Sequence, residues 1–409
     1  MVVAVAETLT VQALGAMTMI APAAFAPVVA AAVDIAPQRV GLFVSATYLA
    51  AMLSGLACVP LIERYGAPRV SQAAALLGAA GLALGVPGWA AALLLSAALI
   101  GIGYGLVNPA SSHILSRATP PRMMSIVFSI KQTGVPVGGA IVGTLVPALL
   151  LAFEWRIALL IVAAIAAVGA LAIHPLRPVG GDPPTQAAIA HAPHVPWVRR
   201  LSGSFAAPVA LVVRTPVLAQ LSVVSFAFSA AQLGLMTYLI SFLKLELGYT
   251  LVAAGLVFSA AQVAGIVAHV TWGIVADRWL SPRTTLATLG FGMAFAGIAT
   301  ASFSAAWPVW MVVIVAAAYG ATAVGWNGVY LAEVARRAPP GSAGIATGGT
   351  QFFTFFGALI GPPTFGFIAS SSGSYAWGYA LFAIPPLAIG MMLMRSAPQR
   401  QPARGQEDR

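Results

Sequence analysis

The feature that most constrains this chain is a series of apolar runs, each about as long as a membrane is thick. A helix that crosses the ~30 Å hydrocarbon core of a bilayer needs roughly 20 mainly apolar residues. Twelve such runs can be placed, and they begin near Leu9, Val40, Ser71, Ala91, Met123, Trp155, Pro216, Leu251, Thr284, Pro308, Ser342 and Trp377. We therefore predict an all-α integral membrane protein with twelve transmembrane helices.

The composition agrees with a protein that lies almost entirely in the membrane. Charged residues make up 7% of the 409 residues and hydrophobic ones 60%, whereas soluble domains carry about 25% charged residues. The net charge of +10 would suggest a nucleic-acid partner in a soluble protein, but no nucleic-acid motif accompanies it. Because Cys58 is the only cysteine, a disulfide within the chain and a cysteine-based zinc site are both excluded.

The basic residues indicate which way the helices run. If the spans alternate in direction, sixteen of the twenty Lys and Arg residues fall on one side of the membrane, whereas Arg39, Arg156 and Lys244 fall on the other. Lys and Arg in short loops stay preferentially on the cytoplasmic side. We therefore predict a multi-pass protein of the bacterial inner membrane with both termini in the cytoplasm.

A stretch rich in proline, glycine and charge interrupts the series after the sixth run. It extends from His174 to Pro216 and is typical of a linker. We predict four segments: a first six-helix bundle over residues 1–173, a cytoplasmic linker over 174–214, a second six-helix bundle over 215–396, and a cytoplasmic tail over 397–409.

The two halves of the chain resemble each other in sequence. NPASSHILSRATPP (108–121) aligns with NGVYLAEVARRAPP (327–340) at an offset of 219, and Gln132 then meets Gln351. LIERYGAPR (61–69) aligns with VADRWLSPR (275–283) at an offset of 214. Six-helix repeats in the same orientation predict two bundles related by a pseudo-two-fold axis along the membrane normal. Transporters with this arrangement bind their solute between the repeats.

The repeated loop resembles the Major Facilitator Superfamily of secondary transporters, and the resemblance covers nearly the whole chain. The second half matches the superfamily's loop pattern, Gly-x-x-x-Asp-Arg-x-x-x-x-Arg, with Gly273, Asp277, Arg278 and Arg283. The segments KQTGVP (131–136) and WNGVYLAEVAR (326–336) are similar to prokaryotic members near the cyanate-permease and organic-anion uptake groups.

The resemblance implies a cytoplasmic gate, since this loop helps to hold the outward-facing state through charge pairs in the superfamily. The first half departs from the pattern, because Val59 stands in place of the glycine and Glu63 in place of the aspartate. A cluster in AEVARR (332–337) fits the same gate, with acidic and basic residues four positions apart on one helix face. The expected gate residues are Glu63, Arg64, Asp277, Arg278, Glu333, Arg336 and Arg337.

One lysine lies inside an apolar run, in FSIKQTGVPVGG (128–139). Lys131 follows Arg122 by nine residues, which at about 1.5 Å per residue corresponds to roughly 13 Å of depth. A lipid-facing ammonium there would cost about 3 kcal/mol or more. We therefore predict that Lys131 faces a central cavity and binds an anionic solute. Two alternatives stay open: a structural bond to backbone carbonyls, and an ammonium that reaches a cytoplasmic vestibule.

Other polar side chains fall at a similar depth and form a candidate layer around Lys131. They are the amides Asn108, Gln132, Asn327 and Gln351, with Trp326 and Tyr330 as aromatic walls. Each amide alone can instead bond a neighbouring helix. His269, eight residues before Asp277, is a candidate for a coupling proton or an anion ligand, and a packed structural histidine is the alternative. In the same region Gly134 and Gly138, like Gly139 and Gly143, form small-x-x-x-small pairs that predict close helix packing.

These observations predict a secondary active transporter that moves a small anionic solute, a carboxylate or an inorganic anion, by alternating access. Its expected partners are the solute, the lipid bilayer and a coupling proton, and we expect a monomer. We expect no enzymatic activity, no cofactor, no metal site and no nucleic-acid partner.

A proton-coupled drug exporter is the alternative function. GVPVGG (134–139) partly resembles the fifth-helix motif of drug–proton antiporters, with different spacing. An exporter of this kind favours a buried carboxylate, whereas we expect all ten acidic residues at span ends, in loops or in the tails. Anion transport is therefore the preferred prediction.

Overall fold

The computed structural model describes residues 1–56, 58–119, 124–173, 208–339 and 343–395, and every regular element in them is helical. In the first half these are α1 (Val2–Ala32), η1 (Pro37–Arg39), α2 (Val40–Leu56), α3 (Cys58–Tyr65), α4 (Ala67–Leu84), α5 (Ala90–Ala118), α6 (Met124–Gln132), α7 (Gly134–Ala152) and α8 (Trp155–Ala172). In the second half they are α11 (Pro216–Leu245), α12 (Leu251–Arg278), α13 (Pro282–Ala301), α14 (Val309–Ala323), α15 (Asn327–Arg337), α16 (Ala343–Ser372), α17 (Tyr375–Phe382) and α18 (Ile384–Arg395). Most of the expected linker and all of the expected tail lie outside the described residues.

Ten helical stretches in the described part of the chain are long and apolar enough to cross a membrane. Two expected spans fall outside this set. The helix α2 has only 17 residues, and the first two turns of α4 contain Arg69, Ser71 and Gln72. The structure therefore supports an all-α membrane protein, and the number of twelve spans stays a prediction.

The first helix begins earlier than its hydropathy predicts, at Val2 instead of near Leu9. The polar residues of this turn fit inside a helix because the hydroxyls of Thr8 and Thr10 donate to the carbonyls of Ala4 and Ala6, both at 2.8 Å. Glu7 consequently lies within α1 and is 0% exposed. Glu7 thus lies in the second turn of α1, near a span end as expected, but the burial of its side chain was not predicted.

The lysine-bearing helix is broken into α6 and α7 at Thr133. Pro136 explains the position of the break. A proline has no N–H to give to the carbonyl four residues before it, here that of Gln132, and its ring crowds that turn. The break leaves Lys131 in the last turn of α6 and Gly134 as the first residue of α7.

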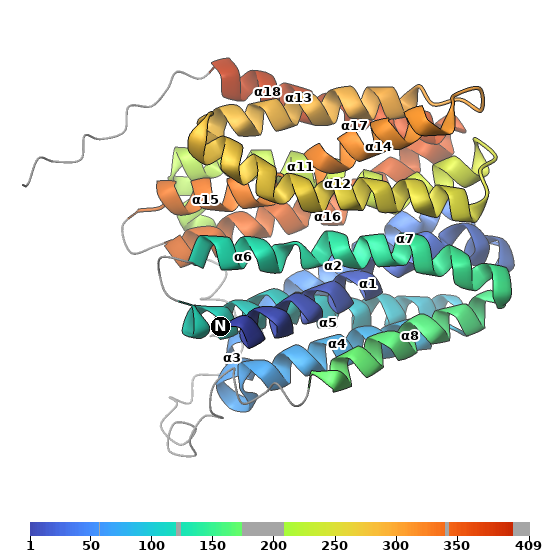
Figure 1. Cartoon of the computed structure of the whole chain (residues 1–409), viewed down its shortest axis with the longest axis horizontal. Coiled ribbons are helices and arrows are strands. Elements are labelled where there is room, and N and C mark those ends of the chain that lie inside the picture. Colours follow the sequence, from blue (N-terminus) through green and yellow to red (C-terminus); the bar gives the residue numbers. More distant parts are fainter. Residues whose placement is uncertain (57, 120–123, 174–207, 340–342, 396–409) are drawn as a thin grey trace, which may run out of the picture.

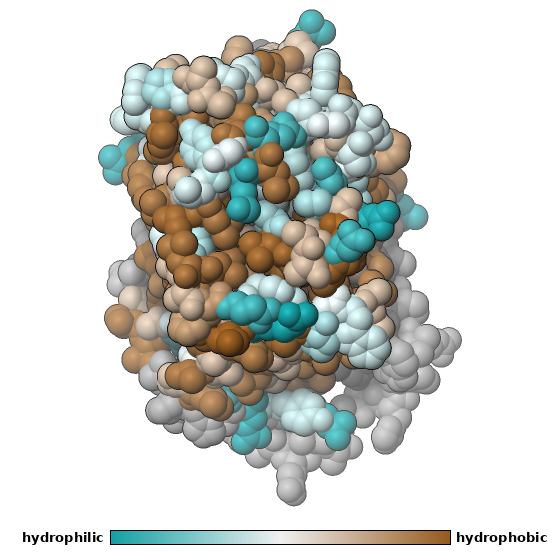
Figure 2. All heavy atoms as spheres, turned by 90° about the vertical axis from the view of Figure 1, so that its right-hand side faces the viewer, coloured by the Kyte–Doolittle hydropathy of each residue, from teal (hydrophilic) through white to brown (hydrophobic). Residues whose placement is uncertain are grey.

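The helices run side by side along the longest axis of the molecule, with residues 1–173 below and 208–395 above in Figure 1. The N-terminus, α3, α15 and the last residue of α18 lie at one end, which carries Arg64, Arg336 and Arg395 and is called here the arginine-rich end. The opposite, far end holds the α1–α2 and α11–α12 connections. Figure 2 looks onto the far end, where hydrophilic residues are scattered among apolar ones.

The two halves of the chain meet mainly where α7 packs on α12 and α2 packs on α16. Glycines permit this approach, as the small-x-x-x-small pairs predicted. Across the halves, a Cβ at Gly143 would lie 2.7 Å from the Gly255 carbonyl oxygen of α12; within the first half, a Cβ at Gly138 would lie 2.5 Å from the Ala13 carbonyl oxygen of α1. Real Cβ atoms do not come so close to backbone oxygens, so the spacing of these helices requires glycine.

Hydrogen bonds across the two halves gather toward the far end. The Tyr238 hydroxyl of α11 lies 2.9 Å from the Gln38 carbonyl oxygen of η1 and 2.7 Å from the Pro362 carbonyl oxygen of α16. Ser45 of α2 donates to the Leu359 carbonyl of α16. Toward the arginine-rich end, by contrast, a Cβ added at Gly273, Gly328 or Gly348 would meet no atom within 4 Å. These two hydrogen bonds between the halves therefore lie toward the far end, whereas nearer the arginine-rich end the halves also contact each other through α6 and α15.

The substitutions Gly255→Ala and Gly273→Ala make the same change on one helix and separate packing from helix propensity. A methyl group at position 255 would collide with the Gly143 carbonyl, and overpacking costs about 1–3 kcal/mol. At position 273 the space is open, so alanine stabilises the helix by about 0.5–1 kcal/mol. Thermal unfolding in detergent should show a lower midpoint for Gly255→Ala and an unchanged or higher one for Gly273→Ala. Equal midpoints would mean that the contact does not stabilise the fold.

Candidate functional site

Lys131 is buried, with 2% of its surface exposed, in the last turn of α6. Its ammonium donates a hydrogen bond of 2.6 Å to the amide oxygen of Asn108 on α5. No carboxylate of the described residues forms an ion pair with it. The structure thus brings together two residues of the predicted polar layer, and the acceptor is a side-chain amide instead of a backbone carbonyl.

Among the described residues, this arrangement leaves the ammonium incompletely satisfied. An ammonium has three N–H donors, and a single neutral amide accepts only one of them. A buried charge is stable only when it is paired and fully hydrogen-bonded. The position is therefore suited to an additional anionic group that would accept the remaining N–H donors.

The other predicted amides lie on three separate helices. Gln132 follows Lys131 as the last residue of α6, and its buried amide oxygen has no hydrogen-bond partner within the described ranges. Asn327 is the first residue of α15, and Gln351 lies on α16; both are half-buried. The alignment of the two halves thus puts Asn108 and Asn327 on α5 and α15, whereas Thr350 of α16 occupies the position equivalent to Lys131.

The predicted aromatic residues lie in the interior of the second half. Trp326 is fully buried and donates from its indole nitrogen to the amide oxygen of Gln232 at 3.1 Å. Its ring meets that of Tyr330 edge-on at 5.3 Å between centroids and that of Phe228 at 5.7 Å. Both predicted aromatics therefore make packing contacts in this conformation.

His269 of α12 is also buried, at 7% exposure. It is one helical turn after Gly265, where an added Cβ would lie 2.9 Å from Val324, so this face of α12 turns toward α14 and the residues that follow it. No hydrogen bond of His269 is recorded among the described residues. The surroundings are those of a packed side chain, and its use for a proton stays a prediction.

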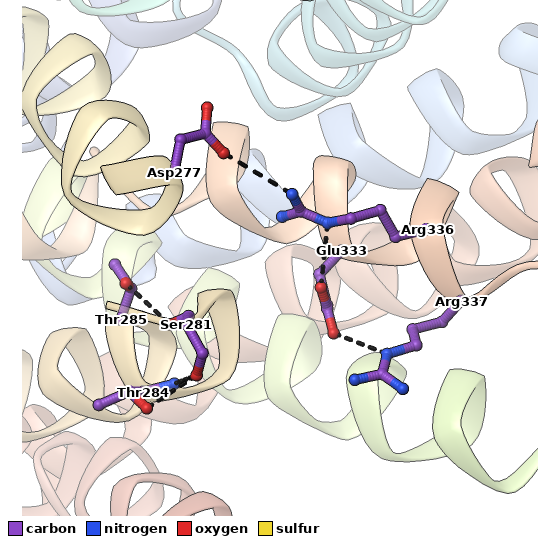
Figure 3. Close-up of polar contacts among 7 residues, drawn as sticks. All are labelled: Asp277, Ser281, Thr284, Thr285, Glu333, Arg336 and Arg337. Atoms are coloured by element: carbon purple, nitrogen blue, oxygen red, sulfur yellow. Dashed lines mark hydrogen bonds and ion pairs between the residues drawn. The ribbon is translucent and has the colours of Figure 1, made fainter. Parts of the chain in front are cut away.

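The charged residues of the predicted gate form a cluster between α12 and α15 (Figure 3). Glu333 is nearly buried and bonds the guanidinium groups of Arg337 at 2.9 Å and Arg336 at 3.3 Å. Arg336 also approaches Asp277 at 3.7 Å, and the Asp277 side chain is 70% exposed. An exposed pair of this kind contributes about 0–1 kcal/mol, so Glu333 holds the cluster more strongly than Asp277 does.

The remaining gate residues are not part of this cluster. Arg278 is exposed at the end of α12. In the first half Arg64 is exposed and stacks on the ring of its neighbour Tyr65, with 5.2 Å between the guanidinium carbon and the ring centroid. The Glu63 side chain lies outside the described residues. The described ion pairs of the gate therefore all belong to the second half.

In the described part of the chain, three further residues have a buried amide or carboxylate without a hydrogen-bond partner, and none of the three was a predicted site residue. Gln12 of α1 and Gln262 of α12 are 0% and 1% exposed, and neither amide has a hydrogen-bond partner among the residues that the structure describes. Glu7 is likewise buried with both carboxylate oxygens unpartnered. Their signal in the sequence is a single amide or carboxyl group inside an apolar run, the same signal that singled out Lys131.

The chain matches the family model of the Major Facilitator Superfamily over residues 8–354. It is 23% identical over 338 residues to a hexuronate transporter of Bacillus subtilis (strain 168), which covers 78% of this chain and 76% of that protein.

Solved transporter structures share the fold. A D-xylose–proton symporter superposes with a TM-score of 0.74 at 16% identity and covers 96% of each chain. A nucleoside transporter superposes with a TM-score of 0.72 at 15% identity and covers 95% of this chain and 99% of that one. With its series of apolar helices and the family match over most of its length, this chain is a multi-pass membrane protein that belongs to the Major Facilitator Superfamily.

Proposed function

We propose that this protein is a secondary active transporter that moves a small anionic solute by alternating access. In this proposal the protein has twelve transmembrane helices in two six-helix bundles, residues 1–173 and 215–396, which are related by a pseudo-two-fold axis. The repeats at offsets of 219 and 214 support it. The arginine-rich end supports an orientation in the bacterial inner membrane with both termini cytoplasmic. A monomer is sufficient, because the solute path lies between the two bundles of one chain.

The proposal that the solute is an anion rests on one observation, the buried ammonium of Lys131. Its partner is the neutral amide of Asn108, at 2.6 Å. A buried cation with a neutral partner attracts an anion, because charge-assisted hydrogen bonds are shorter and roughly twice as strong as neutral ones. A relative that is described as a hexuronate transporter supports a carboxylate as the anionic group. Asn108, Gln132, Asn327 and Gln351 complete the proposed site from both halves, with His269, Trp326 and Tyr330 behind it.

Alternating access is supported by the unequal contact at the two ends. Bonds between the halves at Tyr238 and Ser45 hold the far end together, whereas glycines of α12, α15 and α16 have open space on the side of the arginine-rich end. We propose that this conformation opens to the cytoplasm. In the opposite conformation the cluster of Asp277, Glu333 and Arg336 would meet the first half and close the cytoplasmic side.

The drug-exporter alternative is not favoured. The relative and the solved structures reported above are transporters of polar solutes by their descriptions. Glu7 is a buried carboxylate, but the residues on its helix face, Ala4 and Val11, belong to an apolar cluster formed by the first half alone. A carboxylate on that face is turned away from the second half and from a solute path between the bundles.

The chain has only two lysines, which gives a matched test of the site. Lys131→Gln removes the buried charge, whereas Lys244→Gln removes a half-buried charge in the last turn of α11, at the far end. In a thermal-shift screen of small carboxylates and inorganic anions, we expect anions to raise the unfolding midpoint of the wild type and of Lys244→Gln. Affinity in Lys131→Gln should fall by about 10- to 100-fold, since a hydrogen bond to a charged group contributes about 1.5–3 kcal/mol. Stabilisation by neutral or cationic compounds alone would refute the anionic solute.

The closed far end can be tested with the Tyr238 hydroxyl. Tyr238→Phe removes a hydroxyl whose single proton is shared between the Gln38 carbonyl across the halves and the Pro362 carbonyl of the second half. The bond across the halves contributes at most about 1 kcal/mol, which corresponds to a shift of up to roughly fivefold toward the open far end. Tyr375→Phe is the control, because the buried Tyr375 hydroxyl has no hydrogen-bond partner in the described part of the chain.

The readout uses the single native cysteine. In a Cys58→Ser background, Met236→Cys puts a thiol in the small cavity of about 20 Å³ that Val44 and Tyr48 of α2 line together with α11. An impermeant maleimide added from outside should label this thiol several times faster in Tyr238→Phe than in Tyr375→Phe. Equal labelling rates would show that Tyr238 does not hold the far end closed.

A further inference from the structure

Two glutamines, one on each side of α7, have buried side-chain amides without hydrogen-bond partners in the described structure, which is rare in protein interiors. Gln12 of α1 and Gln262 of α12 are buried, and neither the oxygen nor the nitrogen of either amide has a hydrogen-bond partner in the described structure. Each buried polar atom without a partner costs about 1–3 kcal/mol. Four such atoms in two residues therefore call for a ligand or a second conformation that satisfies them.

Both glutamines are held against glycines of the stretch that follows Lys131. A Cβ at Gly134 would lie 2.8 Å from the Gln12 Cβ and 3.0 Å from its Cγ. The Gln262 amide covers Gly139, where the side-chain nitrogen and carbons are the three nearest neighbours of an added Cβ. The stretch 131–139 thus brings one cation and two free amides to the same segment of α6 and α7.

The two amides lie where the halves of the chain separate. Gln262 is one turn from Ser259, whose hydroxyl donates across the halves to the Ala140 carbonyl at 2.9 Å. Gln12 shares a helix face with Met19 and Ala23, which line the small cavity between α1, α2 and α11. Opening of the far end would therefore expose both amides to the solute path.

We infer that Gln12 and Gln262 bind hydroxyl groups of the solute, so that the transported anion is a hydroxylated carboxylate such as a sugar acid. An amide offers two donors and one acceptor oxygen, which matches a hydroxyl that both donates and accepts. Lys131 takes the carboxylate, and the amides distinguish a hydroxylated ring from an apolar one. This inference rests on the proposed anion transport and adds the chemical class of the anion.

The test compares two ligands that differ in their hydroxyl groups. D-glucuronate and cyclohexanecarboxylate share a six-membered ring and one carboxylate, and only the first carries hydroxyls. Equilibrium binding to the purified full-length protein is measured for both, in the wild type, Gln12→Leu, Gln262→Leu and Gln72→Leu. Gln72 of α4 is the matched control, because its buried amide already donates to the Ala170 carbonyl at 2.9 Å within the first half.

We expect the wild type to bind glucuronate at least tenfold more tightly than cyclohexanecarboxylate. Gln12→Leu and Gln262→Leu should each weaken glucuronate binding by on the order of tenfold and leave cyclohexanecarboxylate within about twofold. Gln72→Leu should change neither. The comparison of the two ligands in the wild type needs no variant. It therefore tests the preference for a hydroxylated carboxylate even if a glutamine substitution prevents folding.

Equal affinity of the wild type for both ligands would overturn the inference, and so would glutamine variants that weaken both ligands alike. If Lys131→Gln still weakens both ligands in that case, the proposed anion transport survives alone. If neither ligand binds the wild type, this inference fails, and the screen of carboxylates and inorganic anions decides the proposed function separately. If Lys131→Gln binds both ligands as the wild type does, the proposed function fails and this inference fails with it.

Discussion

The close approach of α7 and α12 at Gly143 and Gly255 is the contact on which the rest of this structure depends. At this point the backbones of the two halves touch, because neither helix has a side chain between them. In a membrane, helices associate through van der Waals packing and interhelical hydrogen bonds, since lipid is as apolar as the protein interior. A close contact without long interdigitated side chains can also be broken at low cost. It therefore provides both a tight far end and an interface along which two halves can separate.

The break between α6 and α7 connects this packing to the chemistry of the site. Pro136 interrupts the backbone hydrogen bonding of the helix, so that α6 ends at Gln132 and α7 begins at Gly134. The glycines of α7 pack against α1 and α12. The ammonium of Lys131 lies directly before the break, bonded to Asn108 of α5. A movement of α7 between its two neighbours would thus reach Lys131 within one helical turn. The proposed anion site therefore lies next to the helix that joins the two halves. Such proximity allows solute binding to favour one conformation over the other.

The positions of the helices can be predicted from the sequence, but which of their polar side chains are buried can be predicted only poorly. Apolar runs locate most of the helices, because a helix must satisfy its own backbone in lipid. The depth of Lys131 and Asn108 in the membrane stays a prediction. The same reasoning set the start of α1 near Leu9 and missed the burial of Glu7, because hydropathy does not register threonine hydroxyls that bond back to the helix. Gln12 and Gln262 were missed for a different reason. Whether an amide in an apolar helix has a partner depends on the neighbouring helix, and no local pattern contains that information.

We propose that solute binding closes the arginine-rich end of the molecule and opens the far end. Two distances between spin labels measure this change. In a Cys58→Ser background, one cysteine pair at the exposed positions Leu42 and Phe367 reports on the far end, and another at Tyr65 and Trp279 reports on the arginine-rich end. Both pairs join the first half to the second. When a saturating anion is added to the protein in lipid, we expect the first distance to grow while the second shrinks. Distances that stay unchanged, or that move in the same direction at both ends, would contradict it.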